Sequence, residues 1–520
     1  MQPGTSMQIP RHSFQAVSAL SIITGLAAAG SLPAQVTPIA NNPPAPASNA
    51  VTTAAAPLPG RGGGRRGFAG GNQTADRQHM FEVLHITLPA NLPPDAEDPN
   101  RPPNTKPIPG SVNWDDGVRG HTVVRSEWGT WANYDLSKAD PYPLPDPLKL
   151  NDGQMVKDEA TWWQKRRLEI LRDFHTEIYG NIPESTPKVT WTVAGITTNA
   201  DAKTITKKVV GHVDNSSCTN ITVNIGLTVT TPSEAAGPVP VIFRFGGGGF
   251  GGGDFAGGRG GGGVNDPTQQ ILQRGWGYGF YNNNSVQPGG GAGLRSGIIG
   301  LMNKGEFRKP DDWGALMAWA WGFDRCLDYL ETDRNVDARK VGLAGHSFLG
   351  KATIVAMAFD QRLAIAYPSC AGESGTKLHR HILGESVENT CSQGEYYEMA
   401  GNFLKYAGHC DQVPVDSHEL IALCAPRPVF VTGGTEDLWS DPVGEFKACV
   451  AAGPVYRLLG KRDLGTTEMP APDVALLDGD VAFREHTGGH TDAPDWPAFL
   501  KFADKYFTGS SAARQGAVPK

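Results

Sequence analysis

The sequence has little excess of charge of either sign and few long apolar runs. Lysine and arginine number 46, aspartate and glutamate 53, and the formal net charge is −7 over 520 residues. With a net charge this close to neutral, the chain has no excess of basic residues with which to bind nucleic acid or an anionic membrane surface. Beyond the N-terminus, no apolar run reaches the ~20 residues that a membrane-spanning helix needs. We therefore expect no nucleic-acid partner, no stable membrane association, and a monomer.

Cysteine is also scarce, with seven residues in the whole chain. The odd number leaves at least one cysteine unpaired, and the spacing shows no metal-binding pattern. Several cysteines lie in apolar runs, where a buried thiol is the ordinary interpretation. We expect neither a metal nor a cofactor.

The N-terminal residues are typical of an export signal. Basic Arg11 precedes an apolar stretch over residues 16–29, and small residues follow as far as Ala34. This pattern predicts a signal peptide over residues 1–34, with a retained membrane anchor as the alternative, and hence a secreted or periplasmic protein. Residues 35–76, rich in proline, alanine and glycine, predict a disordered linker, and residues 509–520 a disordered tail.

Residues 77–150 contain many prolines and are expected to form an extended lead-in that packs along the core. Within this segment, Phe81–Leu88 alternates between apolar and polar residues, which predicts a strand. The main domain is expected over residues 151–508.

Strand and helix patterns alternate through that domain. A helix is predicted from near Lys157 to Tyr179, and β-branched residues between Lys188 and Thr231 predict antiparallel strands. Shorter apolar runs separated by helical patterns predict a buried parallel sheet, and they lie at 239–245, 276–282, 341–344, 363–367 and 428–432.

The segment around Ser347 has the pattern of a nucleophile elbow. An apolar strand pattern ends at Ala344, a tight turn spans Gly345–Gly350, and an apolar helix pattern follows over Ala352–Phe359. The backbone N–H of Phe348, at the helix N-terminus, can stabilise an oxyanion. The usual second glycine stands one residue late, so an ordinary serine-containing turn is the alternative. The fold expected is an α/β-hydrolase, a three-layer sandwich with a mostly parallel central sheet.

A second glycine-rich stretch, residues 246–253, directly follows the strand predicted at 239–245. In this architecture the loop after that strand supplies another oxyanion N–H, and glycines allow the backbone to approach the substrate. A glycine-rich insertion without such a role is the alternative.

A catalytic serine needs a neutral imidazole to take its proton, and the imidazole needs a carboxylate behind it. His490 lies in a glycine-rich loop before a helix predicted at 496–507, and we favour it as the base. His486 and His418 are the alternatives. Carboxylates follow two later strands, with Glu373 after the first and Glu436 and Asp437 after the second.

Several segments together resemble the bacterial glucuronoyl esterases of carbohydrate esterase family 15. They extend over most of the chain after the linker, and they are far more specific than the serine motif alone. The segments are residues 133–147, Gly345-His-Ser-Phe-Leu-Gly-Lys351, Lys377-Leu-His-Arg380 with Gly384-Glu385, residues 414–428, 439–444 and 454–460, and Gly489-His490 followed by Asp495-Trp496.

The resemblance implies a serine esterase that acts on glucuronoxylan through an acyl-enzyme. Such an enzyme cleaves the ester between 4-O-methyl-glucuronic acid side chains and lignin alcohols. Ser347 would be the nucleophile and His490 the base. Lys351 resembles the family lysine that contacts the sugar hydroxyls, and Trp439 stands where an aromatic ring can stack on the sugar.

The resemblance leaves the acid open. Fungal members carry it after the strand that follows the elbow, at a position that aligns with Cys370. Bacterial relatives can use a carboxylate after the next strand, which favours Asp437, with Glu436 adjacent. Glu373, three residues beyond the fungal position, is a third candidate.

Two departures from the family pattern affect the expected activity. Phe348 replaces an arginine that helps to hold the oxyanion, and Glu398 replaces a tryptophan at a substrate-binding position. Losing one oxyanion donor typically costs on the order of 100-fold in rate. The alternatives are therefore another polysaccharide esterase, for example on acetyl esters, or a weakly active carbohydrate-binding relative.

Overall fold

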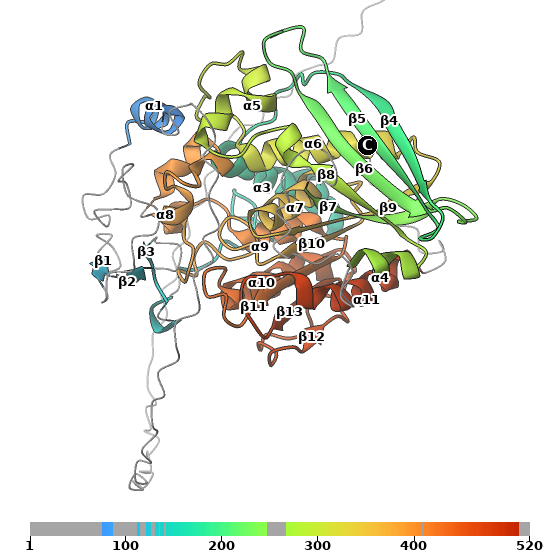
Figure 1. Cartoon of the computed structure of the whole chain (residues 1–520). Coiled ribbons are helices and arrows are strands. Elements are labelled where there is room, and N and C mark those ends of the chain that lie inside the picture. The colour runs from blue at the N-terminus through green and yellow to red at the C-terminus, as the bar shows by residue number, and fades with distance from the viewer. Residues whose placement is uncertain are drawn as a thin grey trace, which may run out of the picture. The chain divides into compact units, whose positions relative to one another are not determined.

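A ten-stranded sheet organises the described part of the chain (Figure 1). The structure is a computed structural model, and it describes residues 75–86, 112–114, 121–125, 131–134, 136–139, 142–246, 267–407 and 409–508. The strand order is β12-β13-β11-β10-β9-β7-β8-β6-β5-β4. In chain order the strands are β4 Val189–Asn199, β5 Thr204–Val213, β6 Asn224–Pro232, β7 Val239–Phe245, β8 Gly277–Asn282, β9 Val336–His346, β10 Ile365–Ser369, β11 Val429–Gly434, β12 Ala475–Leu476 and β13 Val481–His486.

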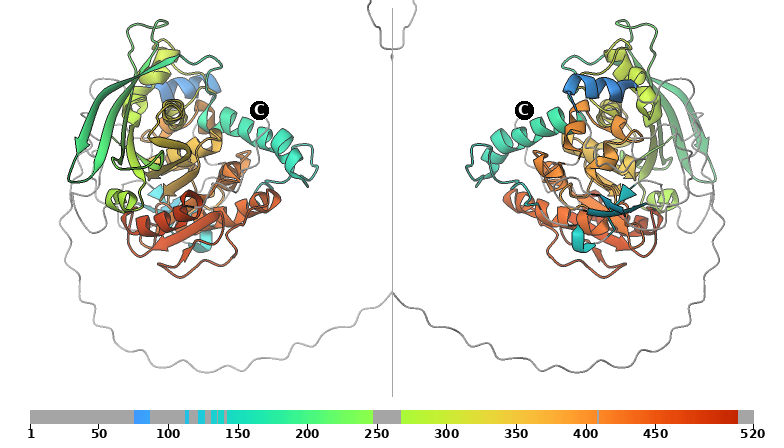
Figure 2. Two further views of the ribbon diagram at one scale, coloured as in Figure 1. Left: turned by 90° about the vertical axis from the view of Figure 1, so that its right-hand side faces the viewer. Right: turned by 90° about the vertical axis from the view of Figure 1, so that its left-hand side faces the viewer.

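Six central strands are parallel, as the short apolar runs predict: β13, β11, β10, β9, β7 and β8. The long strands β4, β5 and β6 are antiparallel, also as predicted, and Figures 1 and 2 show them at one edge of the sheet. Strand β13 is not among the sequence predictions. Its apolar residues are followed at once by Arg484 and Glu485, so it lacks the continuous apolar run by which the other parallel strands were identified.

Helices cover both faces of the sheet. Along β7, Val241 and Phe243 belong to one apolar cluster and Ile242 to another, because successive side chains of a strand point to opposite faces. The larger cluster includes α6 (Ala315–Leu330), α7 (Phe348–Phe359), α9 (Ser417–Cys424) and α10 (Pro442–Leu458). The smaller cluster includes α4 (Pro267–Gln273) and α11 (Trp496–Phe507), which contact each other. This is the three-layer sandwich expected of an α/β-hydrolase.

A further helix precedes the sheet. It consists of α2 (Glu159–Thr161) and α3 (Arg167–Asp173), joined by the π-helical turn Trp162–Arg166 and extended by a second one at Phe174–Tyr179. The shorter elements include several 3₁₀ turns, α5 (Gly297–Met302), α8 (Val387–Thr390) and a separate sheet of β1 (Val112–Trp114), β2 (His121–Arg125) and β3 (Trp131–Ala132). The helix predicted from Lys157 to Tyr179 is confirmed. No helix among the described residues is long and apolar enough to cross a membrane.

The strand predicted at Phe81–Leu88 is wrong. Helix α1 (Ala75–Leu84) includes the first four residues of that segment, and it takes in the last two residues of the expected linker. Asp76 and Met80 are buried one helical turn apart, and the Asp76 carboxylate pairs with Arg308 at 2.9 Å. The signal peptide, the glycine-rich stretch beyond residue 246 and the C-terminal tail lie outside the described residues.

Candidate active site

Ser347 lies at a sharp turn between β9 and α7. Its backbone angles, φ 60° and ψ −134°, are rare for a residue other than glycine and are typical of functional turns. A Cβ atom on Gly345 would come within 2.1 Å of the Leu349 carbonyl, and one on Gly350 within 2.9 Å of the Ser369 carbonyl. Glycine at positions 345 and 350 therefore allows β9, α7 and β10 to approach one another closely. The close contact at Gly350 explains why the second glycine of the motif stands one residue later than usual.

Four neighbouring parallel strands end at this edge of the sheet. In sheet order β13, β11, β10 and β9, they are followed by His490, Asp437, Cys370 and Ser347. The strand ends are in register, because Ser369 pairs with both His346 and Thr432, and Gly434 pairs with His486. The topology thus brings together residues that are far apart in the sequence.

Asp437 and His490 are joined by a hydrogen bond. His490 Nδ1 lies 2.7 Å from Asp437 Oδ2, and Ser440 Oγ lies 3.3 Å from the same nitrogen. Burial would raise the pKa of Asp437, but the hydrogen bond to His490 and its charge hold that pKa below the ordinary value. An ionised Asp437 fixes the proton on Nδ1 and leaves Nε2 free to act as a base.

The His490 ring lies beside the nucleophile turn. Its centroid is 4.3 Å from that of His346, the residue before Ser347. Burial and the neighbouring His490 lower the pKa of His346 to about 4, so His346 is neutral near pH 7. In the part of the chain described, no hydrogen bond joins His490 to the Ser347 hydroxyl. Catalytic hydrogen bonds are often long without substrate and shorten in the complex.

The two competing histidines have other partners. His486 is fully buried, with Nδ1 2.8 Å from Asp495 Oδ2 and Nε2 2.9 Å from the Gly489 carbonyl. His418 is also fully buried, and its Nε2 lies 2.9 Å from the Pro145 carbonyl. Both rings tie loops to the core. His486 has both ring nitrogens engaged, and His418, whose Nδ1 has no partner, is too deeply buried to meet a substrate at the elbow.

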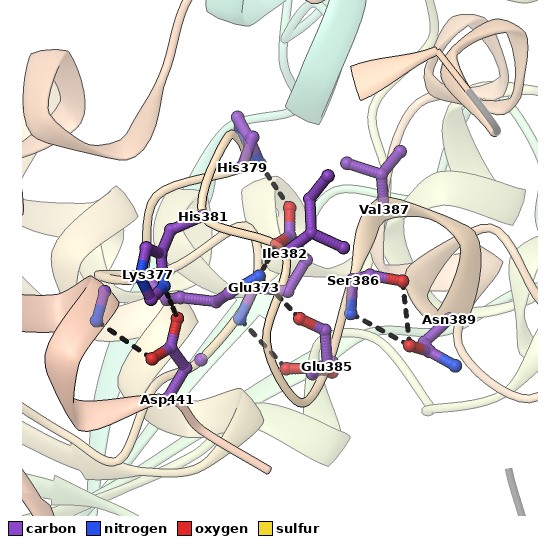
Figure 3. Close-up of polar contacts among 12 residues, drawn as sticks. Glu373, Lys377, His379, His381, Ile382, Glu385, Ser386, Val387, Asn389 and Asp441 are labelled. Atoms are coloured by element: carbon purple, nitrogen blue, oxygen red, sulfur yellow. Dashed lines mark hydrogen bonds and ion pairs between the residues drawn. The ribbon is translucent and has the colours of Figure 1, made fainter. Parts of the chain in front are cut away.

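The two alternative acids do not contact His490. Glu436 is exposed beside Asp437. Glu373 is fully buried and pairs with Lys377 Nζ at 2.8 Å and with His379 Nδ1 (Figure 3). Burial would raise the pKa of Glu373, but these two partners lower it to about 2.

Cys370 lies between Ser347 and Asp437 in the order of the strands that carry them. It follows β10 with a left-handed backbone, φ 45°, and its side chain is buried. Burial and the nearby Asp437 raise the pKa of its thiol well above the ordinary value, so the thiol is neutral. At the position where fungal members carry the acid, this chain therefore has an uncharged neighbour of the Asp437 carboxylate.

Lys351, one helical turn after Ser347, is buried among carboxylates. Its Nζ lies 2.7 Å from Glu385 Oε1 and 3.5 Å from Glu398 Oε2. Burial would lower the pKa of Lys351, but these acids raise it, so the ammonium is charged. Burial raises the pKa of Glu398 despite the lysine, and its Oε2, which lies near the ammonium, accepts no hydrogen bond. Glu398 is thus a second carboxyl group beside the ammonium, and it is buried with it.

Glu385 links the two residues predicted to contact the sugar. Its carboxylate accepts from Lys351, and its backbone N–H donates to the Trp439 carbonyl at 2.8 Å. Lys377 Nζ donates to the Glu385 carbonyl at 2.6 Å and to Glu373 Oε2 at 2.8 Å, and Figure 3 draws these three residues together. The half-buried Trp439 is therefore held in place through its backbone.

Sequence reasoning treated Glu385 only as a motif residue and did not identify His346 or Ser440. The one signal for Glu385 in the sequence was the glycine before it, because glycine is favoured where the backbone has a positive φ or another backbone approaches closely. In the structure Gly384 has φ 62°, and a Cβ there would come within 2.1 Å of the Leu438 carbonyl. His346 and Ser440 become recognisable only when β9, β11 and β13 are placed side by side.

Comparisons with known proteins identify the family. A family model described as glucuronyl esterase, fungi, matches residues 305–460. The chain is 31% identical over 409 residues to carbohydrate esterase MZ0003 from an unknown prokaryotic organism, covering 73% of this chain and 93% of that protein. It is 26% identical over 344 residues to a 4-O-methyl-glucuronoyl methylesterase of Cerrena unicolor, covering 64% of this chain and 65% of that protein.

Among solved structures, a CE15 glucuronoyl esterase from Teredinibacter turnerae T7901 superposes with a TM-score of 0.68 at 32% identity. The match covers 84% of this chain and 99% of that one. The α/β-hydrolase fold and the resemblance inferred from the sequence are both confirmed. The chain belongs to carbohydrate esterase family 15, the family of the glucuronoyl esterases.

Proposed function

We propose that this protein hydrolyses esters of glucuronic acid, with the 4-O-methyl-glucuronate side chains of glucuronoxylan, esterified to lignin alcohols, as its natural substrate class. The observation that carries the proposal is the Asp437–His490 pair, 2.7 Å apart, beside a strained serine turn. A histidine with one ring nitrogen fixed by a carboxylate is the base that a serine esterase needs.

In the proposed mechanism, the Ser347 hydroxyl attacks the ester carbonyl while His490 Nε2 takes its proton. The tetrahedral oxyanion accepts hydrogen bonds at the N-terminus of α7, where the Phe348 N–H has no intrahelical partner. His490 then gives the proton to the departing alcohol, which leaves a glucuronoyl ester on Ser347. Water, activated by the same imidazole, releases the acid.

Substrate recognition is assigned to Lys351 and Trp439, with Glu398 beside the lysine. A buried ammonium can donate to sugar hydroxyls, and a half-buried indole can stack on a pyranose ring. Glu385 would act as a positioning residue, because it is bonded to both Lys351 and the Trp439 backbone.

The test is hydrolysis of benzyl glucuronate by the wild type beside Ser347→Ala and His490→Ala. We expect turnover by the wild type, a loss of about 1,000-fold or more in both variants, and fluorophosphonate labelling that requires Ser347. Labelling without glucuronate hydrolysis, but with release of acetate from acetylated xylan, would favour another polysaccharide esterase.

Absence of both labelling and hydrolysis would favour a carbohydrate-binding relative. That outcome has one specific observation in its favour, since Phe348 stands where the family pattern has arginine.

We also propose that residues 1–34 direct export and that residues 35–74 link them to the folded part. N-terminal sequencing of the protein recovered from the medium or periplasm tests this, with a mature start after Ala34 as the expected result. A mature protein that retains residues 1–34 would contradict it.

A further inference from the structure

The residues around Asp437 contain a set of atoms that can bind a soft divalent cation. A thiol of Cys370, a carboxylate oxygen of Asp437 and a ring nitrogen of His490 lie within 4.8 Å of one another. They come from the ends of three adjacent strands, β10, β11 and β13. Thiolate, imidazole and carboxylate are the ligands that zinc binds in proteins, at about 2.0 to 2.3 Å from each atom.

We propose that these three residues form an inhibitory site for Zn²⁺ and its heavier relative Cd²⁺, and that occupancy switches the esterase off. The predicted loss of esterase activity rests on the proposed function, because His490, one of the three ligands, is also the proposed base. The binding event itself depends only on the three ligands.

The three ligand atoms are close enough for one ion to bridge them. His490 Nδ1 and Asp437 Oδ2 are 2.7 Å apart, so an ion between them replaces the proton that they share. Ligand atoms around a tetrahedral zinc lie about 3.3 to 3.8 Å apart, so the pair must separate slightly while the sulfur closes in. Side-chain rotations of this size leave the strand ends in place.

The charges of the three ligands also suit a divalent ion. The carboxylate is already ionised, and binding converts the Cys370 thiol to a thiolate, with release of its proton to solvent. Two negative ligands and one neutral imidazole then neutralise the cation. The ion can enter from the side of His490, whose side chain is 23% exposed, whereas Cys370 and Asp437 are buried.

Occupancy would abolish catalysis for a simple reason. A neutral imidazole carries one ring proton, and a cation on Nδ1 leaves that proton on Nε2. Nε2 can then no longer accept the Ser347 proton, and Asp437 is engaged by the metal. The softness of the sulfur ligand predicts inhibition by Zn²⁺ and Cd²⁺ but not by Mg²⁺ or Ca²⁺, which prefer oxygen ligands.

The experiment titrates the full chain with Cd²⁺ and with Zn²⁺, following both ester hydrolysis and the ultraviolet charge-transfer band of a cadmium thiolate. We expect one equivalent of Cd²⁺ to give the band, with the same midpoint as inhibition, and chelation to reverse both. In Cys370→Ser the band should vanish, and the half-inhibiting Zn²⁺ concentration should rise by about 10-fold or more.

Cys218→Ser is the matched control, because Cys218 is the one cysteine of the seven that is not buried, and it should behave as the wild type. Equal inhibition of Cys370→Ser and the wild type, or inhibition of the wild type without a thiolate band, would overturn the proposal. Cys370→Ala provides a second variant if the serine protein does not fold. Lack of esterase activity in the metal-free wild type would contradict the proposed function, while the band still tests the metal site.

Discussion

Replacement of Asp437 by asparagine tests which carboxylate supports the base. The substitution keeps the size of the side chain and removes its charge. Asparagine can present its amide N–H₂ to the ring, which favours the tautomer with the proton on Nε2. That tautomer cannot accept the Ser347 proton.

The structure sets the expected magnitude. Asp437 is 4% exposed and bonds His490 Nδ1 at 2.7 Å, so little water is available to take its place. Loss of the carboxylate in comparable triads lowers kcat by about 10⁴-fold, which corresponds to about 5 kcal/mol of transition-state stabilisation. We expect a fall of about 10³- to 10⁴-fold in kcat on benzyl glucuronate, with KM changed by less than about 3-fold.

Two matched controls come from the neighbouring carboxylates. Glu436→Gln alters an exposed residue one position away, and its kcat should stay within about 2-fold of the wild type, as for most surface changes. Glu373→Gln breaks a buried pair with Lys377 and should lower stability more than kcat. The reasoning would be refuted if Asp437→Asn kept more than a tenth of wild-type kcat while Glu373→Gln lost activity at full folding.

Three further predictions concern the surroundings of the site. Phe348→Arg should raise kcat by about 10-fold or more, because it adds a charge-assisted donor at the oxyanion; an unchanged kcat in steady-state assays would show that the arginine is dispensable here. Asp441→Ala should lower the free energy of unfolding in urea by about 2 to 3 kcal/mol, because Asp441 caps α10 through the Gly444 N–H and bonds His381 Nδ1 at 2.6 Å; a loss as large in Asp441→Asn would contradict the capping role. The pKa of Glu373, lowered from 4.5 to about 2, contributes stability that is present above pH ~4.5 and lost as the pH falls toward ~2, so the stability difference between wild type and Glu373→Gln should shrink over that range.

The sequence predicted most of the sheet because its parallel strands are buried on both faces. The runs at 239–245, 363–367 and 428–432 are mostly apolar, with Arg244 and Thr432 as the polar residues, and each corresponds to a strand within two residues. The order of those strands could not be read from the sequence. The order depends on which face of the sheet each helix covers: α4 and α11 lie on one face, and α6, α7, α9 and α10 lie on the other. Local sequence patterns do not encode that choice of face.

Helix α1 shows how an apolar pattern can mislead. Its buried face includes Asp76 and Arg77, and its exposed face carries Val83, which is 44% exposed. Hydrophobic periodicity assumes that polar residues face water, but Asp76 is buried because Arg308 neutralises it. Of the apolar residues behind the apparent strand alternation, Phe81 and Ile86 pack only partly against the core and Val83 is exposed.

The candidates for the acid of the proposed triad could be narrowed to three carboxylates from the sequence, but not to one. In the structure Glu373 pairs with Lys377, four residues later, and with His379. The sequence shows these two partners only as polar residues of a loop, and it does not show that they pair with Glu373. What distinguishes Asp437 is the register of β11 against β13, which places it opposite the loop of His490. Tertiary pairing, not residue type, decides the role.

The same loop carries the proposed acid and the proposed stacking residue, and this arrangement couples chemistry to sugar binding. Asp437 and Trp439 are two residues apart, and the loop is fastened near its C-terminal end by the Glu385 N–H to the Trp439 carbonyl and by His381 to Asp441. Glu385 also fixes Lys351, which is one helical turn from Ser347. A sugar that engages the lysine and the indole would therefore contact a single bonded frame that also holds the proposed nucleophile and the proposed acid. Such a frame restricts the orientation of the bound ester without further contacts, because preorganised groups need no rearrangement during the reaction.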